Sequence, residues 1–265
     1  MVCGGTELAA YLALACEVAE NSAGSMRRGR DDRVVADSPR DVKIEADLRL
    51  HRLIVERLTK DTPYPVLSEE GSGLQTTGAV PEHRWIIDPL DGSLNFSRGI
   101  PFSCISIALW RGMEPLLGVV NDMNRDELFS GLAAGGAWLN GQPVRVSDVE
   151  TKGQAILVTG FPTAGDFSGA ALSETVSEIQ AYKKVRLLGS AALSLAYVAC
   201  GRADAYQENN IAIWDVAAGL AIVKGAGGIA GFRTGDKENR LIVRAANPRL
   251  FHKMASIDAG TGTVR

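Results

Sequence analysis

Cysteine and histidine are scarce in this sequence, and neither forms a pattern typical of a metal site or a disulfide framework. The four cysteines lie far apart, mostly among apolar neighbours: Cys3, Cys16, Cys104 and Cys200. No C-x-x-C pair occurs, so we expect buried free thiols in a reducing compartment. The three histidines are equally dispersed: His51, His83 and His252. We expect them on the surface or in packing contacts, and not as metal ligands.

Long apolar runs and a strong excess of charge are absent as well. No apolar run approaches the length that crosses a bilayer, and the N-terminal residues lack a basic stretch followed by an apolar core and a cleavage site. The formal net charge is −3, which gives no reason to expect a nucleic-acid groove or an anionic membrane partner. We therefore expect a cytoplasmic protein that binds neither nucleic acid nor membrane.

The chain of 265 residues is long enough for one large domain or two closely packed lobes. In residues 1–142, apolar spacing predicts two helices, over 6–29 and 45–59, with a mobile polar loop at 31–41 between them. Later segments are typical of strands joined by short turns: 102–110, 115–121, 126–132 and 136–139. These features predict an α+β lobe in which both helices cover one face of a largely antiparallel sheet.

Residues 143–265 alternate strands and helices, which predicts an α/β lobe. The expected strands are 154–159, 184–188, 203–207, 228–232 and 241–245. The expected helices are 168–181, 190–200, 215–225 and 247–256. The sequence shows no internal repeat, low-complexity tract or flexible linker, so the two lobes should be fused rather than tethered.

One stretch, W-I-I-D-P-L-D-G-S-L-N-F at 85–96, combines an apolar strand with an acidic turn. Asp88 and Asp91 are separated by a proline, whose fixed φ and missing backbone donor stiffen the turn. Two carboxylates on a rigid strand end suit a hard cation such as Mg²⁺, and the free amides after Gly92 suit an anion at the start of a short helix. A metal beside a phosphate indicates phosphate-ester chemistry, although a D-x-x-D-G segment alone is more often an ordinary turn.

Further candidate residues lie at strand ends and helix starts. Glu69 and Glu70 follow a short strand, at the carboxyl end where open sheets place sites. Asp47 lies in the first turn of a predicted helix, where a favourable interaction with the helix dipole explains it equally well. Ser190 and Asp215 are expected N-caps of two helices. The amides after Ser190 could face an anion, and a capping Asp215 can also direct an oxygen at a metal.

These motifs occur together in one order: E-E at 69–70, the 85–96 stretch, and W-D-V-A-A-G at 214–219. The segments G-S-A-A at 189–192, G-R-A-D-A-Y at 201–206 and V-R-A-A-N at 243–247 belong to the same pattern. From about Asp41 to Asn247 the sequence resembles the inositol monophosphatase family of Mg²⁺-dependent, lithium-sensitive phosphatases. The resemblance implies a layered αβαβα sandwich of the inositol monophosphatase and fructose-1,6-bisphosphatase type, and a homodimer.

The resemblance also implies roles for residues at matching positions. The implied metal ligands are the carboxylates of Glu69, Asp88, Asp91 and Asp215 and the backbone carbonyl of Leu90. The implied substrate contacts are Asp91, Gly92, Ser93, Gly189, Ser190, Ala191, Glu208 and Asp215, with Glu208 on substrate hydroxyls. The implied catalytic residues are Asp47 and Ser93, which would orient the attacking water, and Glu69. The expected cofactor is roughly two to three Mg²⁺ ions, with Li⁺ as an inhibitor.

Two departures from the family pattern bear on rate and metal number. Ser93 stands where threonine is common, and it keeps the hydroxyl. Lys43 and Ile44 replace the valine and threonine of the family's D-x-V-T-x-x-D segment. The exchange removes a polar group near Asp47 and adds a charge.

The resemblance favours hydrolysis of inositol 1-phosphate to inositol and phosphate, by attack of a metal-activated water. A 3′(2′),5′-bisphosphate nucleotidase is an alternative, although such relatives tend to have Lys-Glu where this chain has Leu94 and Asn95. Fructose-1,6-bisphosphatase or another sugar phosphatase is a further alternative. A metal-binding regulatory protein without catalysis is a distant alternative, favoured only by Ile44.

Overall fold

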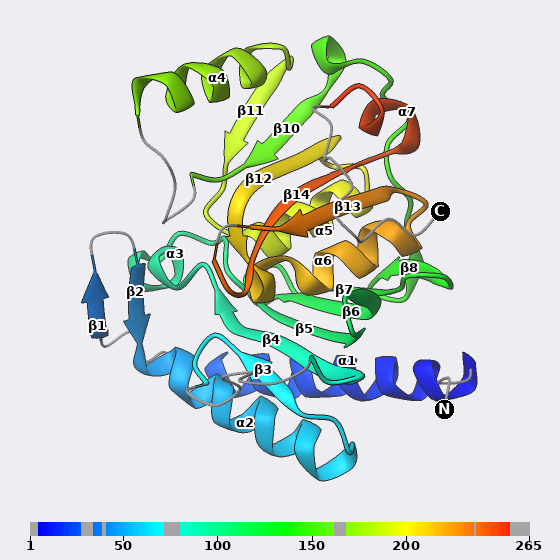
Figure 1. Ribbon diagram of the computed structural model, residues 1–265. Coiled ribbons are helices and arrows are strands. Elements are labelled where there is room, and N and C mark those ends of the chain that lie inside the picture. The colour runs from blue at the N-terminus through cyan, green and yellow to red at the C-terminus, as the bar shows by residue number, and fades with distance from the viewer. Residues whose placement is uncertain are drawn as a thin grey trace.

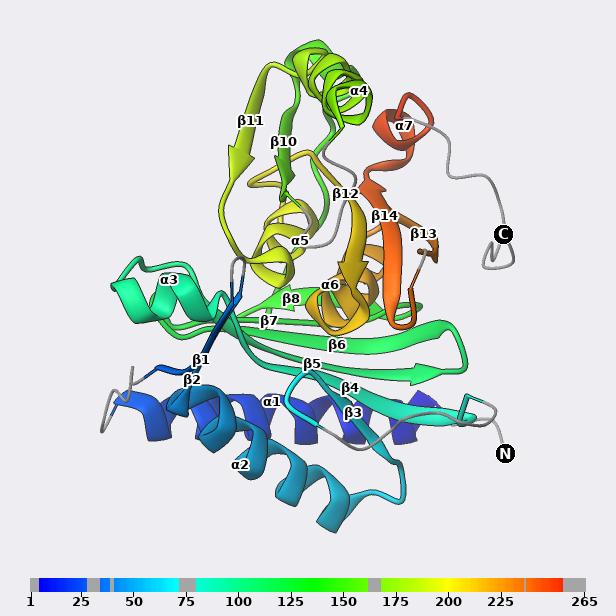
Figure 2. The ribbon, with the colours of Figure 1, turned by 60° about the vertical axis from the view of Figure 1, so that its left-hand side comes forward.

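Alternating layers of helix and sheet make up the molecule (Figure 1). The computed structural model describes residues 5–27, 34–38, 41–71, 80–161, 168–235 and 237–254. From one end to the other, a pair of long helices is followed by a seven-stranded sheet, a second helix pair, a five-stranded sheet and outer helices (Figure 2). This order confirms the αβαβα sandwich expected from the sequence.

The seven-stranded sheet lies in the first half of the chain and has the strand order β3-β4-β5-β6-β7-β8-β9. Its strands are β3 (Val66–Ser68), β4 (His83–Asp91), β5 (Cys104–Arg111), β6 (Glu114–Asp122), β7 (Glu127–Leu132), β8 (Gly136–Leu139) and β9 (Gln142–Pro143). The β3–β4 pair is parallel and the other pairs are antiparallel. The predicted largely antiparallel sheet is confirmed, because short turns can join only antiparallel neighbours.

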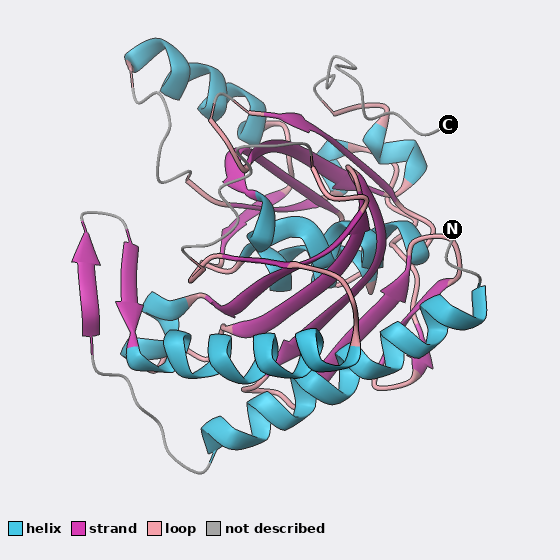
Figure 3. Ribbon diagram, turned by 60° about the horizontal axis from the view of Figure 1, so that its bottom comes forward, coloured by secondary structure: helices cyan, strands magenta, loops and turns pink. Residues whose placement is uncertain are grey.

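Helices α1 (Gly5–Arg27) and α2 (Glu45–Asp61) cover one face of this sheet, as predicted (Figure 3). On α2, Leu50, Ile54 and Leu58 recur every fourth residue and are fully buried. They belong to one apolar cluster with Trp85 and Ile87 of β4. Burying a side chain of this size contributes about 1.5–3 kcal/mol, so the apolar face holds the helix on the sheet.

The five-stranded sheet has the order β11-β10-β12-β14-β13. Its strands are β10 (Ile156–Thr159), β11 (Lys184–Leu187), β12 (Ala205–Ala212), β13 (Ile229–Thr234) and β14 (Arg240–Ala246). Helices α5 (Ala191–Ala199) and α6 (Ile213–Gly225) lie between the two sheets (Figure 2). Buried residues of both sheets pack in one cluster, so the division into lobes 1–142 and 143–265 stays a prediction.

Helix α6 approaches the first sheet very closely. Gly118 of β6 makes this possible, because a Cβ atom there would lie 2.2 Å from the backbone oxygen of Ala218. Trp110 of β5 donates its indole N–H to the Ala217 carbonyl oxygen at 3.2 Å. These contacts fix the position of α6, and therefore of the acidic residue in its first turn.

Helix α4 (Gly169–Gln180) and helix α7 (Pro248–Phe251) lie on the outer side of the five-stranded sheet (Figure 1). The helix predicted at 247–256 is wrong in length, since α7 has four residues. The Asn247 side chain caps it by accepting a hydrogen bond from the Leu250 amide at 3.0 Å. The Lys253 and Met254 amides then bond three residues back, which tightens the chain into turns and ends the helix. Residues 255–256 lie outside the described part.

The loop predicted at 31–41 is wrong for much of its length. Strands β1 (Val34–Ser38) and β2 (Asp41–Ile44) pair antiparallel in a separate hairpin at the edge of the molecule (Figure 1). Val34 and Val35 are 52% and 51% exposed, so no buried apolar face marks β1 in the sequence. Residues 31–33 and 39–40 lie outside the described part.

The described cysteines are free thiols and two of the histidines make packing contacts, whereas His51 lies with its Nδ1 2.8 Å from the Ser68 hydroxyl. Cys16, Cys104 and Cys200 are free thiols, but only Cys104 is fully buried, and Cys3 lies outside the described residues. His83 stacks on Tyr64 and His252 packs against Phe251. No helix in the described ranges combines the length and apolar character that crossing a membrane requires.

Candidate active site

Strand β4 carries two of the candidate acids and does not end in the turn predicted at Asp88. It continues to Asp91, with an irregularity between Asp88 and Asp91. Asp88 pairs with Ser106 and Asp91 with Cys104. The paired residues are therefore three positions apart on β4 but only two positions apart on β5. This is a β-bulge, which Pro89 accommodates because it has no amide to donate. Residues two apart on β5 face the same side, so the bulge directs both carboxylates to one face of the sheet.

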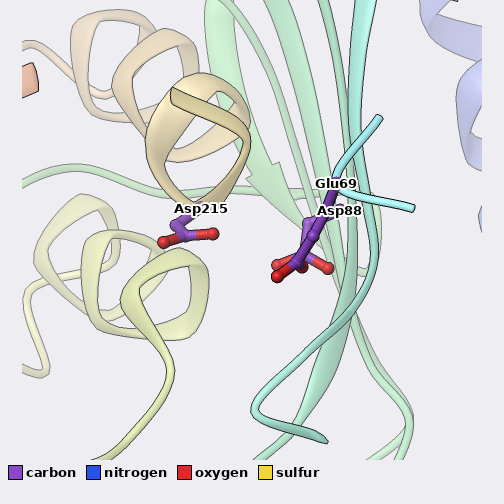
Figure 4. Close-up of side chains that lie close together, drawn as sticks. All are labelled: Glu69, Asp88 and Asp215. Carbon is purple, nitrogen blue, oxygen red and sulfur yellow. The ribbon is translucent and has the colours of Figure 1, made fainter. Parts of the chain in front are cut away.

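Three carboxylates from different elements converge at this face (Figure 4). Asp88 comes from β4, Glu69 from the turn after β3, and Asp215 from the first turn of α6. One oxygen of each lies within 4.8 Å of those of the other two. The Glu69 amide donates to the Ile87 carbonyl oxygen at 3.4 Å, which ties the Glu69 turn to β4.

The electrostatics of these acids favour a bound cation. Burial raises the pKa of Asp88 well above its usual range, and repulsion from Glu69 and other acids raises it further. Burial, again followed by repulsion from Glu69, raises the pKa of Asp215 in the same way. Asp88 is buried and Glu69 and Asp215 are half-buried, and carboxylates this close together stay ionised only if a positive charge compensates them. Oxygen ligands in this number and spacing fit Mg²⁺.

Asp215 was predicted as an N-cap, and that prediction is wrong. Helix α6 begins at Ile213, with Ala212 as its N-cap residue and no side-chain cap. Asp215 is therefore the third helical residue, and its carboxylate faces Glu69 and Asp88 instead of closing the helix (Figure 4).

Asp91 lies beside this group but is held by helix α5. Its Oδ2 accepts hydrogen bonds from the Ser190 hydroxyl at 2.6 Å and from the Ala192 amide at 2.7 Å. Burial raises the pKa of Asp91 to about 6, against the effect of these hydrogen bonds. Ser190 is the predicted N-cap of α5, since its hydroxyl also accepts from the Leu193 amide at 3.2 Å. Metal ligation by Asp91 and by the Leu90 carbonyl stays a prediction.

Gly92 connects β4 to the short helix α3 (Ser93–Arg98). It has a φ of +88°, and a Cβ atom would lie 2.8 Å from the Phe102 carbonyl oxygen. Both facts require glycine at this position. Gly189, before α5, also has a positive φ of 77°. The side-chain amide of Asn95 donates to the carbonyl oxygens of Phe102 and Leu188, both at 2.9 Å, and so links α3 to the chain that leads into α5.

The structure brings Asp47 and Ser93 together, as the resemblance implied. The Ser93 hydroxyl lies 2.8 Å from Asp47 Oδ1 and 2.8 Å from the Leu90 carbonyl oxygen. Asp47 Oδ2 also accepts the Ile44 amide at 2.7 Å, at the start of α2. Asp47 therefore serves both as a helix-start acid and as the partner of Ser93. Ile44 is fully buried in the apolar cluster beneath, so the missing threonine hydroxyl is replaced by packing.

A cavity of about 460 Å³ contains the candidate residues of both sheets. The first sheet and α3 contribute Glu69, Asp88, Leu90, Asp91, Gly92, Ser93 and Asn95. The second sheet and its helices contribute Thr159, Gly189, Ser190, Ala191, Tyr206, Glu208, Ile211, Asp215 and Arg240. Every predicted site residue except Asp47 lines the cavity, and Asp47 reaches it through Ser93.

Glu208 occupies the wall formed by the second sheet. It is 7% exposed, and burial raises its pKa to about 7. The Tyr206 hydroxyl donates to Glu208 Oε2 at 2.9 Å. A hydrogen-bonded carboxyl group in a cavity can bind a substrate hydroxyl. No sequence motif marked Arg240 as a site residue, because its place depends on how β12 and β14 pair. Tyr206 ends the 201–206 segment of the family pattern, but that segment assigned it no role in the site.

Comparison with known proteins agrees with this arrangement. The model of the inositol monophosphatase family matches residues 6–257. An inositol-1-monophosphatase of Rhizobium meliloti is 42% identical over 192 residues, which cover 72% of this chain and 71% of the relative. A Nus factor SuhB of Xylella fastidiosa is 42% identical over 197 residues, covering 74% of this chain and 70% of the relative.

Solved structures show the same fold. The extragenic suppressor protein suhB of Bartonella henselae has a TM-score of 0.80 and 33% identity, covering 92% of this chain and 96% of that chain. An inositol monophosphatase of Anabaena has a TM-score of 0.77 and 32% identity, covering 93% and 94%. With the family match over nearly the whole sequence, these likenesses show that the chain belongs to the inositol monophosphatase family of phosphoric monoester hydrolases.

Proposed function

We propose that this protein is a Mg²⁺-dependent phosphate monoesterase that hydrolyses inositol 1-phosphate. The observation that carries the proposal is the convergence of Glu69, Asp88 and Asp215 within 4.8 Å in a cavity that also contains Ser93 and Glu208. A regulatory protein without catalysis is disfavoured, because the full set of acids and the Ser93 hydroxyl are retained.

Glu69, Asp88 and Asp215 would hold the metal, with Asp91 and the Leu90 carbonyl as further candidate ligands. When bound, Mg²⁺ supplies charge stabilisation for the phosphoryl oxygens and lowers the pKa of water. These groups come from the turn after β3, from β4 of the same sheet and from the first turn of α6, so the metal site depends on the contact between the first sheet and α6.

The chain's own groups would position the reactants. The amides that follow Gly92 are free at the start of α3 and suit the phosphate oxygens. The Ser93 hydroxyl, held by Asp47, would orient the attacking water in line with the ester oxygen. Glu208 would accept a hydrogen bond from a hydroxyl of the leaving alcohol, with Tyr206 fixing its carboxyl group.

The choice of inositol 1-phosphate rests on the relatives' names and on Glu208. The Rhizobium meliloti relative is named an inositol-1-monophosphatase. Leu94 and Asn95 follow Ser93 where nucleotidases of the superfamily tend to have Lys-Glu. The side-chain amide of Asn95 donates a hydrogen bond to the Leu188 carbonyl oxygen, so this amide is not available to bind a nucleotide.

Phosphate release with Mg²⁺ from a panel of esters tests the proposal. The panel contains inositol 1-phosphate, fructose 1,6-bisphosphate and 3′-phosphoadenosine 5′-phosphate. We expect inositol 1-phosphate to have the highest kcat/KM. A clear preference for the nucleotide would overturn the substrate assignment and keep the metal site. Folded protein that releases no phosphate from any ester would overturn the enzyme assignment.

Two finer expectations rest on the family alone. We expect Li⁺ to inhibit phosphate release by competing for the cation site, which a Li⁺ titration at fixed Mg²⁺ measures. We expect a homodimer, which sedimentation equilibrium measures directly. A monomer at micromolar concentration would contradict the second expectation without affecting the first.

A further inference from the structure

Arg240 stands out among the described residues that line the cavity, because it is the one basic side chain in an acid-rich wall. It is the first residue of β14, and it pairs with Ala212, the residue directly before α6. It therefore lies at the junction of the second sheet with the helix that carries Asp215. The side chain is half-buried.

The surroundings of Arg240 leave much of its hydrogen-bonding capacity unused. Its Nη1 lies 3.5 Å from the Asn210 carbonyl oxygen, which is a long hydrogen bond. No ion pair of Arg240 with a carboxylate occurs in the described part of the chain. The side chain nevertheless lines the cavity, together with Glu208 of the neighbouring strand.

A bulge in β12 creates this opening. The pairing of β12 with β14 shifts between Glu208 and Ile211, where Asn210 has a φ of +61°. The bulge leaves Glu208 and Ile211 lining the cavity, together with Arg240 on the neighbouring strand. The guanidinium group has five N–H donors in a planar fork that fits a carboxylate or a phosphate.

The cavity thus has two chemically different ends. The candidate metal ligands Glu69 and Asp88 belong to the first sheet, whereas Arg240 and Glu208 belong to the second. If the phosphate that is cleaved lies at the acids, the leaving alcohol faces the second sheet. We propose that Arg240 is a specificity-determining residue that admits phosphate monoesters whose leaving alcohol carries a second anionic group, either a carboxylate or a phosphate. The inference rests on the proposed phosphatase function and extends it beyond neutral polyol phosphates.

Matched esters and variants test the inference. One pair is glycerol 2-phosphate and 2-phosphoglycerate, which differ by a carboxylate in the leaving alcohol. The other pair is fructose 1-phosphate and fructose 1,6-bisphosphate, which differ by a second phosphate. The variants are Arg240→Gln, which removes the charge, and Arg240→Lys, which keeps it. Arg145→Gln is the control, because it loses the same charge at a side chain that is 81% exposed and outside this cavity.

In Arg240→Gln, we expect the kcat/KM ratio of anionic to neutral ester to fall about tenfold or more, as for the loss of a charged hydrogen bond. Arg240→Lys should restore part of the ratio, and Arg145→Gln should not change it. The two ester pairs show whether carboxylate, phosphate or both are recognised. An equal fall for neutral and anionic esters would overturn the inference, because Arg240 would then act on the cleaved phosphate. An unchanged ratio would overturn it too.

The failure of the phosphatase proposal has a different signature. If the wild-type protein releases no phosphate, the same esters can be titrated into it by calorimetry with Mg²⁺ present. Tighter binding of 2-phosphoglycerate than of glycerol 2-phosphate, lost in Arg240→Gln, would support the role of Arg240 even then. Equal binding of both esters would overturn it.

Discussion

At the scale of single residues, the site depends on side chains that are costly to bury. Asp88, Asp91 and Glu208 are buried and Asp215 is half-buried, and the loss of contact with water raises the pKa of all four. The bulge at Pro89 and Leu90 is what lets Asp88 and Asp91 share a face. A regular strand would direct residues three apart to opposite faces. The arrangement thus opposes stability and is explained by the cation that it can bind.

Ser93 offers a test of how the attacking water is oriented. Its hydroxyl has one proton, which can be donated to Asp47 or to the Leu90 carbonyl, but not to both at once. We expect Ser93→Ala to lower kcat by roughly 10²-fold, as for the loss of a general acid–base contact, with little change in KM. Ser93→Thr keeps the hydroxyl and should retain most activity. Steady-state kinetics on inositol 1-phosphate check this, once equal melting temperatures show that the variants are folded. A rise in KM with an unchanged kcat would contradict it.

Most candidate residues were identifiable from the sequence, but not their geometry. The acids at 69, 88, 91 and 215 were marked by short motifs, whereas the capping role of Asp215 was mistaken because the start of α6 lies two residues earlier than predicted. Arg240 had no local signal at all. Its place in the cavity follows from pairing with Ala212, a contact between residues far apart in the chain.

At the scale of elements, α6 joins the two halves of the site. It carries Asp215, contacts the first sheet through Gly118, and lies beneath the second sheet. Its residues are largely apolar on all sides, as expected for a helix buried between layers. The separation of α6 from β6 therefore controls the separation of Asp215 from Asp88.

A methyl group at Gly118 tests this dependence. Gly118→Ala places a Cβ atom 2.2 Å from the Ala218 oxygen, so α6 must move away from β6. We expect a loss of about 1–3 kcal/mol in the free energy of unfolding, with weaker Mg²⁺ binding. Denaturant titration and calorimetry measure the two effects.

Gly24→Ala is the matched control for Gly118→Ala. Gly24 lies within α1, and a Cβ atom there would meet no atom within 4 Å. Alanine should stabilise this helix by up to about 1 kcal/mol. Equal effects of the two substitutions would contradict the account of α6 packing.

Elements with regular apolar spacing were predicted well, and so was the largely exposed strand β11, whereas the β1–β2 hairpin and the end of α7 were not. The seven-stranded sheet and helix α2 have fully buried side chains at regular spacing, which the sequence displays. The β1–β2 hairpin has exposed valines and depends on backbone pairing, so its residues were taken for a loop. Helix α7 ends early because hydrogen bonds between residues three apart replace those of the α-helix. The spacing of apolar residues in the sequence does not predict this change.

At the scale of the whole molecule, the buried acids link stability to pH and to metal. In the folded state the pKa of Asp91 is about 6 and that of Glu208 about 7, compared with ordinary values of 3.8 and 4.5. The folded protein therefore holds protons to higher pH than the unfolded chain does. This contribution to stability is complete below the ordinary pKa values and is lost as the pH rises through about 6 to 7.

We expect the metal-free protein to melt at a lower temperature at about pH 8 than at about pH 5. Mg²⁺ binds the ionised carboxylates, so it should raise the melting temperature at the higher pH and have little effect at the lower one. Scanning calorimetry with EDTA and with Mg²⁺ at both pH values measures this. A metal-free protein that becomes more stable with rising pH would contradict the assignment of raised pKa values to the site.

Phosphate release from inositol 1-phosphate as a function of Mg²⁺ concentration, in the wild-type protein and in Asp215→Asn, tests whether the three converging acids bind the catalytic metal. We predict saturable dependence on Mg²⁺ in the wild type and a loss of roughly 100-fold or more in Asp215→Asn, since even residues behind metal ligands change affinity by up to that factor. In EDTA the variant should melt at the same or a higher temperature than the wild type, because a neutral side chain of the same shape replaces an acid whose charge is repelled by its neighbours. Release that is independent of Mg²⁺, or equal in the two proteins, would contradict the assignment of the three converging acids as the catalytic metal site.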